Sequence, residues 1–258
     1  MKENSENNYI YGKNPIVEAL SKNPKRINKI FIQKDLFFDN RLKKINNLAY
    51  ENKIPVQKTS LSKFQEYFED NPNFQGVIAS VSPVEYMELE DFLNIKKEGF
   101  KRIVILDGVS DPHNFGAIIR TVAAAGFDGV MVSNHRSATI TPVVEKISSG
   151  AINHIPIIKT TSLSASIDTL KKHDFWVIAT QMEAKDNYYE IDYTDMNFAL
   201  VMGSEGSGIS KTILNKADWL VKLESHFESL NVSATTAVIL YEALRQIKTK
   251  NAFQEKKK

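Results

Sequence analysis

The sequence predicts an α/β protein in two parts: a small N-terminal α/β domain and a larger C-terminal α/β domain with a mostly parallel sheet. The length of 258 residues suits two domains. Short β-rich runs alternate with helical patterns, which is typical of α/β folds. Continuous apolar runs such as Ile103–Leu106 and Phe198–Met202 suit strands that are buried on both faces of a parallel sheet.

The N-terminal domain is expected over residues 1–83. Its strands are predicted at Ile27–Ile32, Ile54–Gln57 and Gly76–Val81. Its helices are predicted at Pro15–Leu20, Leu36–Tyr50 and Leu61–Phe68, the second beginning near Asp39. Residues 84–101 are rich in charge and suit either a linker or an exposed helix that carries Leu89, Phe92, Leu93 and Ile95. We interpret them as the linker between the domains.

The C-terminal domain is expected over residues 102–258. Its strands are predicted at Ile103–Leu106, Gly129–Val132, Ile155–Ile158, Phe175–Thr180, Phe198–Met202 and Trp219–Leu223. Apolar residues recur at helical spacing from Phe115 to Ala123, and Gly126 is typical of the residue that ends a helix. The last helix is predicted over Ser233–Ile247.

Amino-acid usage excludes several kinds of protein. The chain has no cysteine, which excludes disulfides, cysteine nucleophiles and thiolate metal sites. Its five histidines show no metal-ligand spacing, so no metal site is expected. No run approaches the roughly 18 apolar residues of a membrane span, and no signal peptide is apparent. We therefore expect a cytoplasmic protein without a membrane partner.

The net charge of +2 is unevenly distributed. Residues 1–83 carry 13 Lys and Arg against 9 Asp and Glu, and residues 243–258 carry 6 against 1. The middle segment, residues 84–242, carries 14 against 21. Basic ends favour a polyanionic partner such as a nucleic acid, but a solvated surface with a Lys-rich terminus explains the same pattern.

Polar loops follow three of the predicted C-terminal strands. The first, Asp107–Gly116, opens a helix that carries Arg120, and its turn- and cap-forming residues also suit a well-capped connection. The second, Gly203–Ser210, contains three glycines but matches neither the P-loop nor the dinucleotide-binding pattern. Bare backbone there can lie against a flat ligand. The third, Glu228–Ser233, precedes the last helix, where Ser233 is a plausible N-cap and Ser229 and Asn231 can satisfy helix-terminal amides. All three loops can converge at one edge of the sheet.

The three loops together resemble the SpoU/TrmH family of SPOUT-class RNA ribose 2′-O-methyltransferases. The resemblance rests on Leu106–Arg120, Val201–Gly208 and Ser229–Ser233, in this order and spacing. The N-terminal Tyr11–Leu20 and Gln75–Val77 resemble the ribosomal-protein-like RNA-binding domain of the 23S rRNA guanosine 2′-O-methyltransferase subgroup.

The resemblance implies a C-terminal SPOUT domain with a deep trefoil knot and an N-terminal RNA substrate-binding domain. It implies S-adenosyl-L-methionine as cofactor, RNA as partner and a homodimer. The implied activity is methyl transfer to a ribose 2′-hydroxyl, of a guanosine in 23S rRNA. The cofactor-binding positions that it implies are Gly203, Gly206, Val221, Leu223 and Leu230.

The same resemblance assigns catalytic positions to Arg120, Asn114, Glu205, Ser229 and Asn231. A ribose hydroxyl is a poor nucleophile, so the reaction needs alignment and help with the proton. Arginine stays protonated, so Arg120 suits stabilisation of a developing alkoxide and contact with a phosphate. The identity of the proton acceptor stays open.

Two departures from the family pattern affect the cofactor site. Lys222 stands where proline is usual, and Ser225 stands where glycine is usual. They motivate one alternative, a non-catalytic RNA-binding or ribosome-assembly protein on the same fold. A tRNA ribose methyltransferase is the nearest rival, although the N-terminal domain favours rRNA.

Overall fold

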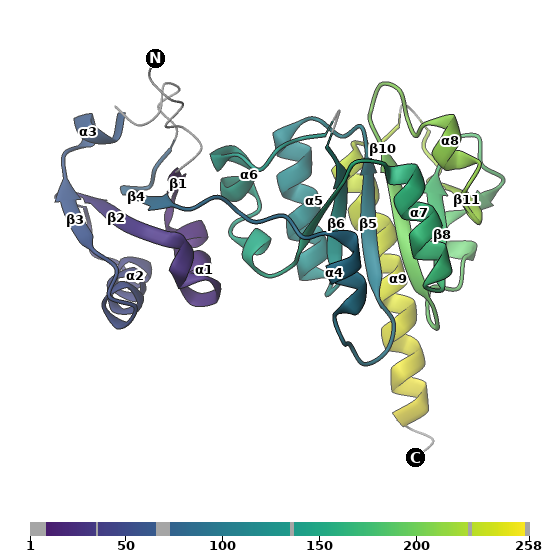
Figure 1. The fold of residues 1–258 in the computed structure, drawn as a ribbon, viewed down its shortest axis with the longest axis horizontal. Helices are drawn as coiled ribbons and strands as arrows, with labels where there is room; N and C mark the ends of the chain where they lie inside the picture. Colours follow the sequence, from purple (N-terminus) through teal and green to yellow (C-terminus); the bar gives the residue numbers. More distant parts are fainter. Residues whose placement is uncertain (1–8, 35, 66–72, 135–136, 227–228, 256–258) are drawn as a thin grey trace. The chain divides into compact units, whose positions relative to one another are not determined.

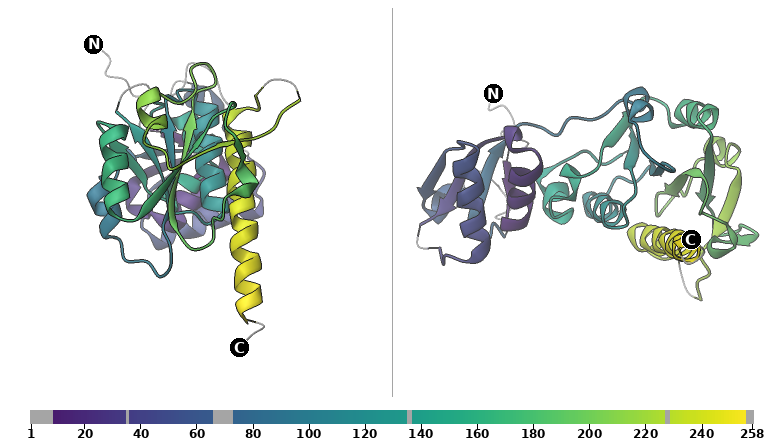
Figure 2. Two further views of the ribbon diagram at one scale, coloured as in Figure 1. Left: turned by 90° about the vertical axis from the view of Figure 1, so that its right-hand side faces the viewer. Right: turned by 90° about the horizontal axis from the view of Figure 1, so that it is seen from below.

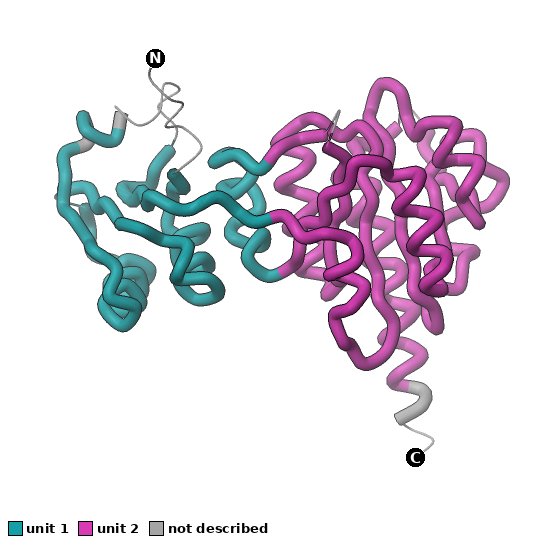
Figure 3. Tube along the Cα trace, in the orientation of Figure 1, with its two compact units in different colours: residues 1–85, 140–154 teal, residues 86–139, 155–258 magenta. Residues whose placement is uncertain are grey.

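The computed structural model describes residues 9–34, 36–65, 73–134, 137–226 and 229–255 (Figure 1). Its packing divides the chain into two compact units, coloured in Figure 3. Unit 1 takes in the chain up to Glu85 together with Ile140–His154, and unit 2 takes in Tyr86–Thr139 and everything from Ile155 onward. The domain boundaries predicted from sequence stay predictions. The packing of residues 140–154 with unit 1 was not anticipated.

Unit 1 contains a four-stranded sheet in the order β1 (Tyr9–Tyr11), β4 (Val77–Val81), β2 (Ile27–Gln33) and β3 (Val56–Thr59). β4 is antiparallel to both its neighbours, whereas β2 and β3 are parallel. The three predicted strands are confirmed. β1 was not predicted because three residues are too few to show an alternating pattern.

Helices cover both faces of this sheet. α1 (Lys13–Lys22) and α2 (Asn40–Glu51) bury an aliphatic cluster against one face. α2 begins as predicted, since the Asp39 side chain accepts a hydrogen bond from the Leu42 N–H at 2.8 Å and caps the helix. α3 (Leu61–Gln65) follows β3, and Phe64 packs in an aromatic cluster with Phe31 and Ile78. Of the predicted Leu61–Phe68 helix, residues 66–68 lie outside the described part of the chain.

A buried ion pair fixes residues 140–154 within unit 1. This segment contains α6 (Pro142–Ile147) and the 3₁₀-turn η3 (Ala151–Asn153), while a second turn, η2 (Pro24–Arg26), precedes β2. Arg26 donates through Nη1 and Nη2 to the two carboxylate oxygens of Glu145 at 3.0 and 2.5 Å. Both residues are about 5% exposed. Burial raises the pKa of Glu145, and the paired guanidinium offsets part of this effect.

Unit 2 contains a seven-stranded sheet in which every pairing is parallel. The strand order is β7 (Ile157–Thr160), β6 (Gly129–Ser133), β5 (Arg102–Asp107), β10 (Asn197–Gly203), β8 (Phe175–Thr180), β11 (Trp219–Lys222) and β9 (Asp186–Asn187). All six predicted strands are present, and the parallel sheet is confirmed. β7 begins two residues later than predicted, after Pro156, which lacks a backbone donor.

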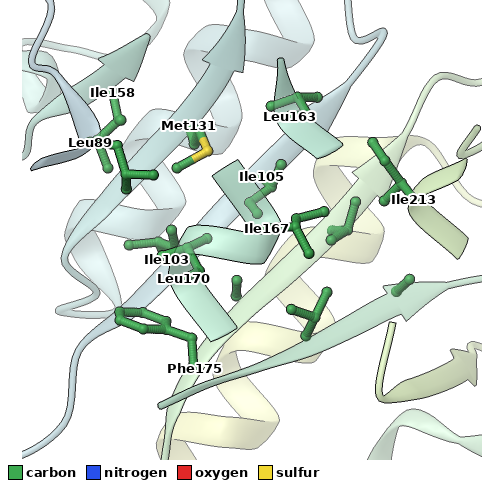
Figure 4. Packing of buried hydrophobic residues seen from close by; sticks show 14 of the residues in the cluster. Leu89, Ile103, Ile105, Met131, Ile158, Leu163, Ile167, Leu170, Phe175 and Ile213 are labelled. Carbon is green, nitrogen blue, oxygen red and sulfur yellow. The ribbon is translucent and has the colours of Figure 1, made fainter. Parts of the chain in front are cut away.

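Helices cover both faces of the unit 2 sheet (Figures 1 and 2). On one face, α4 (Leu89–Asn94), α7 (Leu163–Lys172) and α8 (Lys211–Leu214) bury the cluster drawn in Figure 4. On the other face, α5 (Pro112–Ala124) packs beside α9 (Val232–Glu255). The turn η4 (Tyr188–Glu190) follows β9. The helix considered for the predicted linker is present as α4, but it is not exposed, since Leu89 and Phe92 are buried in the cluster.

Two further expectations concern the whole chain. The trefoil knot implied by the family resemblance stays a prediction. None of the helices in the described ranges is both long and apolar enough to cross a bilayer.

Candidate active site

The candidate site is built on loops at the carboxyl ends of two neighbouring strands. β5 and β10 pair in register, with Asp107 opposite Gly203, so their following loops begin side by side. The Ser210 backbone N–H donates to Asp107 Oδ2 at 2.7 Å and ties the two loops together. Carboxyl ends of parallel strands are where open α/β sheets place their ligand crevice.

The first loop places Asn114 at the start of α5. Asp111 accepts hydrogen bonds from the backbone N–H groups of His113 and Asn114 at 3.3 and 2.9 Å. Pro112 occupies the first helical position, where its missing donor costs nothing. The predicted capped connection is confirmed, and it fixes the direction in which Asn114 leaves the helix.

Three side chains from three loops meet in what we call the amide–carboxylate cluster, Asn114, Glu205 and Asn231. Asn114 Nδ2 donates to Glu205 Oε1 at 3.1 Å. Asn231 Nδ2 donates to the same oxygen at 2.7 Å and to Asn114 Oδ1 at 2.8 Å. The predicted convergence of the three loops is therefore confirmed, and Glu205 Oε1 accepts two amide hydrogen bonds.

Asn231, rather than Ser233, caps the last helix. α9 begins at Val232, one residue before the predicted start. Asn231 Oδ1 accepts from the backbone N–H groups of Ser233 at 2.9 Å and Ala234 at 3.4 Å, and from Ser233 Oγ at 2.6 Å. The expectation that Ser233 is the N-cap was wrong, because α9 begins early enough for Asn231, two positions before Ser233, to accept from its first amides. The alternative that Asn231 satisfies helix-terminal amides is confirmed.

The side chains of Arg120 and Ser229 make no hydrogen bond to the three residues of this cluster. Arg120 is exposed on α5, and its guanidinium makes no hydrogen bond or ion pair with the residues that the structure describes. It lies six residues beyond Asn114, about 9 Å further along the helix axis. Ser229 is exposed two residues before Asn231. Their catalytic roles stay predictions.

Local packing requires glycine at position 203, independently of any ligand. A Cβ at this position would lie 2.4 Å from the Gly208 carbonyl carbon and 2.6 Å from the Ile209 nitrogen. The loop folds back here because Ser204 and Gly208 exchange backbone hydrogen bonds of 3.2 and 3.0 Å. Gly206, by contrast, is exposed, and a Cβ there would meet nothing within 4 Å. Gly206 therefore presents open backbone.

The remaining predicted cofactor positions differ in exposure. Val221 is buried in β11, and its carbonyl already accepts a hydrogen bond from the Gln181 N–H at 2.9 Å. Leu223 is half-buried, and Leu230 is 48% exposed beside the cluster residue Asn231. Lys222 is half-buried and Ser225 is exposed. Within the described ranges, no three His, Asp or Glu side chains lie close enough together to hold a metal ion.

Asp107 is a site residue that the sequence reasoning did not single out. Its carboxylate holds the second loop through Ser210. The available signal was an acidic residue at the last position of a buried strand, directly before a glycine.

These features define an α/β protein with a polar site at the carboxyl edge of a parallel sheet. A family model described as the SpoU rRNA Methylase family matches residues 101–241. A second model, described as RNA 2′-O ribose methyltransferase substrate binding, matches residues 9–87. The chain belongs to the SpoU rRNA methylase family, a family of RNA methyltransferases.

Individual proteins and solved structures are similar to this chain. A "Putative TrmH family tRNA/rRNA methyltransferase" of Staphylococcus aureus (strain MSSA476) is 39% identical over 93% of this chain and 97% of its own. The AdoMet-bound rRNA methyltransferase from Sinorhizobium meliloti has a similar fold, with a TM-score of 0.77, 22% identity, and coverage of 94% and 88%. The A. aeolicus TrmH/SpoU tRNA modifying enzyme is 32% identical, with a TM-score of 0.53 and coverage of 64% and 84%.

Proposed function

We propose that this protein transfers a methyl group from S-adenosyl-L-methionine to a ribose 2′-hydroxyl in RNA. The observation that carries this proposal is the amide–carboxylate cluster at the carboxyl edge of the sheet, with Arg120 on the same helix as Asn114. The proposed substrate is a guanosine of 23S rRNA, as in the subgroup that the N-terminal motifs resemble.

The residues around the cluster suit this cofactor. S-adenosyl-L-methionine supplies, when bound, a methyl group on a positively charged sulfur, together with a flat adenine base. The open backbone at Gly206 and the exposed Leu230 offer a flat, partly apolar surface for a base. The Glu205 carboxylate adds a negative charge that suits a cationic ligand. The carbonyl of Val221 is the least available of the predicted contacts, because it already accepts a hydrogen bond from the Gln181 N–H.

The cluster supplies fixed geometry for the acceptor ribose. Two amide donors hold Glu205 Oε1, so the direction of the second carboxylate oxygen is set before substrate arrives. That oxygen can accept a hydrogen bond from the 2′-hydroxyl and so orient the hydroxyl group. The exposed Arg120 guanidinium can hold an RNA phosphate by a bidentate contact and stabilise negative charge developing on the oxygen.

Ribosomal RNA is the substrate that we propose first, and tRNA is the second candidate. The match of residues 9–87 to a substrate-binding model supports recognition of RNA by the N-terminal domain. The tRNA candidate is supported by the 32% identity to the A. aeolicus tRNA modifying enzyme.

A homodimer is also part of this proposal. On α9, Ala234, Val238 and Tyr241 are exposed at positions that share one helix face. Val238 and Tyr241 are 37% and 50% exposed. Apolar side chains on one face of a helix favour a packed interface.

The proposal is tested by combining cofactor binding with methyl transfer in one preparation. Calorimetry with S-adenosyl-L-methionine measures binding, and mass spectrometry of nuclease digests measures 2′-O-methylnucleosides in 23S rRNA and bulk tRNA. Binding together with 2′-O-methylguanosine in 23S rRNA is the expected result. Transfer to tRNA alone would replace the substrate, and absence of cofactor binding would favour the non-catalytic RNA-binding protein.

A further inference from the structure

Unit 1 exposes two adjacent phenylalanines in the loop between β2 and α2. Phe37 is 83% exposed and Phe38 is 61% exposed. Burying a phenylalanine side chain stabilises a protein by roughly 1.5–3 kcal/mol, and neither residue obtains this stabilisation from the fold. We call Phe37 and Phe38 the aromatic tip.

The residues on both sides of the aromatic tip are held by contacts within unit 1. Leu36, directly before it, packs against the aliphatic cluster and lies over Gly76, where a Cβ would be 2.5 Å from Leu36 Cδ1. Asp39, directly after it, caps α2 and accepts a hydrogen bond from Lys13 Nζ at 2.6 Å. This lysine lowers the pKa of Asp39, so the carboxylate stays charged. The two phenylalanines are therefore held outward by fixed neighbours.

Basic side chains occupy the same end of the unit 1 sheet. The Lys34 backbone N–H donates to the Thr59 carbonyl at 2.8 Å, so the ends of β2 and β3 lie together. Lys34 and Lys58 are exposed there, and Lys63 is exposed on α3, which follows β3. From residue 28 to residue 63 the sequence has eight Lys and Arg against three Asp and Glu.

Aromatic side chains surrounded by cations are suited to unpaired nucleotides. Each base offers a flat face for stacking, and the flanking phosphates attract lysine. Stacked bases inside a continuous duplex offer no such face to a side chain. A protein partner would not require this concentration of positive charge.

We propose that Phe37 and Phe38 stack on unpaired bases of the substrate RNA, while Lys34 and Lys58 contact the flanking phosphates. This inference rests on the proposed function and adds the class of substrate, an RNA with an unpaired loop or bulge. The aromatic tip then selects where on a folded RNA the N-terminal domain binds.

The test is RNA binding by the full chain without cofactor, so that it does not depend on methyl transfer. The probes are a fluorescein-labelled RNA hairpin with 2-aminopurine in its unpaired loop, and the blunt duplex of the same stem. Fluorescence anisotropy gives the affinity, and 2-aminopurine quenching reports stacking. The variants are the double change Phe37→Ala and Phe38→Ala, the double change of both residues to Tyr, and Tyr50→Ala.

Tyr50 is the matched control, because it is an 87% exposed aromatic near the far end of α2, about 15 Å along the helix axis from Asn40. We expect the double alanine variant to bind the hairpin about tenfold more weakly or worse and to lose the quenching. The double tyrosine variant and Tyr50→Ala should bind as the wild type does.

Wild-type affinity for the hairpin in the double alanine variant would overturn the inference, and it would then favour a protein partner for the tip. A hairpin affinity of the wild type no better than its duplex affinity would also overturn it. Either result leaves the methyltransferase proposal standing. A wild type that binds the hairpin through the tip but transfers no methyl group would overturn only the proposed function.

Discussion

Asn231 and Glu205 are joined by a 2.7 Å hydrogen bond from the Asn231 amide nitrogen, while the oxygen of the same amide caps α9. One side chain therefore both stabilises the start of the last helix and orients the carboxylate of the candidate site. A substitution that replaces the amide nitrogen but keeps the oxygen therefore tests the two roles separately.

Asn231→Asp should keep the cap and lose the orientation of Glu205. Aspartate caps helices as well as asparagine does, but it places a second carboxylate against Glu205 where a donor was. We expect methyl transfer to fall about 100-fold or more, with thermal stability close to that of the wild type. Asn231→Ala should additionally lose about 1 kcal/mol of stability. Wild-type turnover in Asn231→Asp would exclude a role for the cluster.

Arg120→Ala should abolish turnover without affecting cofactor affinity. Removing one group that stabilises developing charge costs about 10²–10³ in rate. The exposed guanidinium contributes little packing, so the unfolding midpoint should stay unchanged. Single-turnover methylation and calorimetry with S-adenosyl-L-methionine measure the two effects. Retained turnover would contradict the assignment of Arg120.

Gly203→Ala and Gly206→Ala form a matched pair within one loop. The new Cβ at position 203 would collide with backbone, so we expect a loss of about 1–3 kcal/mol and weakened cofactor binding. The Cβ at position 206 meets open space, so stability should not change. Weaker cofactor binding in Gly206→Ala, measured by calorimetry, is the expected sign of a ligand against this backbone. Unchanged binding would remove Gly206 from the cofactor site.

Glu145→Ala should destabilise unit 1 strongly, because it leaves the charge of the Arg26 guanidinium buried without its carboxylate partner. Breaking one side of a buried pair costs about 3–5 kcal/mol. Urea unfolding of the full chain measures this loss. The double change Arg26→Met and Glu145→Leu should recover most of it. A single variant as stable as the wild type would show that the pair contributes nothing to this packing.

Tyr241→Arg should weaken the proposed homodimer, because it places a charge in the middle of the exposed α9 face. Light scattering of the wild type should give about twice the chain mass of 29.2 kDa, and the variant should give the mass of one chain. Ser164→Arg, a change of a half-buried residue on α7, serves as the control and should leave the mass unchanged. A monomeric wild type would contradict the proposal.

The fold was largely predictable because its strands carry strong local signals. Ile103–Leu106 and Phe198–Met202 are continuous apolar runs, and they became the adjacent central strands β5 and β10. Asp39 marked the start of α2 because a capping residue acts locally. β1 was missed because its three residues are too few to show an alternating pattern of apolar and polar side chains.

The candidate site was predictable in its residues and only partly in its geometry. Strand-following loops indicated that Asn114, Glu205 and Asn231 could meet, but no local pattern gives their hydrogen bonds. The choice between Asn231 and Ser233 as the cap depends on where α9 begins, to within two residues, which is the usual uncertainty of a helix end. Arg26 and Glu145 are 119 residues apart, and a contact at that separation leaves no periodic signal.

The discontinuity of unit 1 has a consequence for synthesis on the ribosome. Domains generally fold as the chain emerges, with the N-terminal domain first. Here the N-terminal sheet can form early, with Arg26 Nε donating to the Ser82 carbonyl, but the guanidinium has no carboxylate partner until Glu145 has been translated and released from the exit tunnel. Unit 1 therefore completes its folding only after the first strands of the methylase domain have emerged, so the assembly of the two regions is coupled in time.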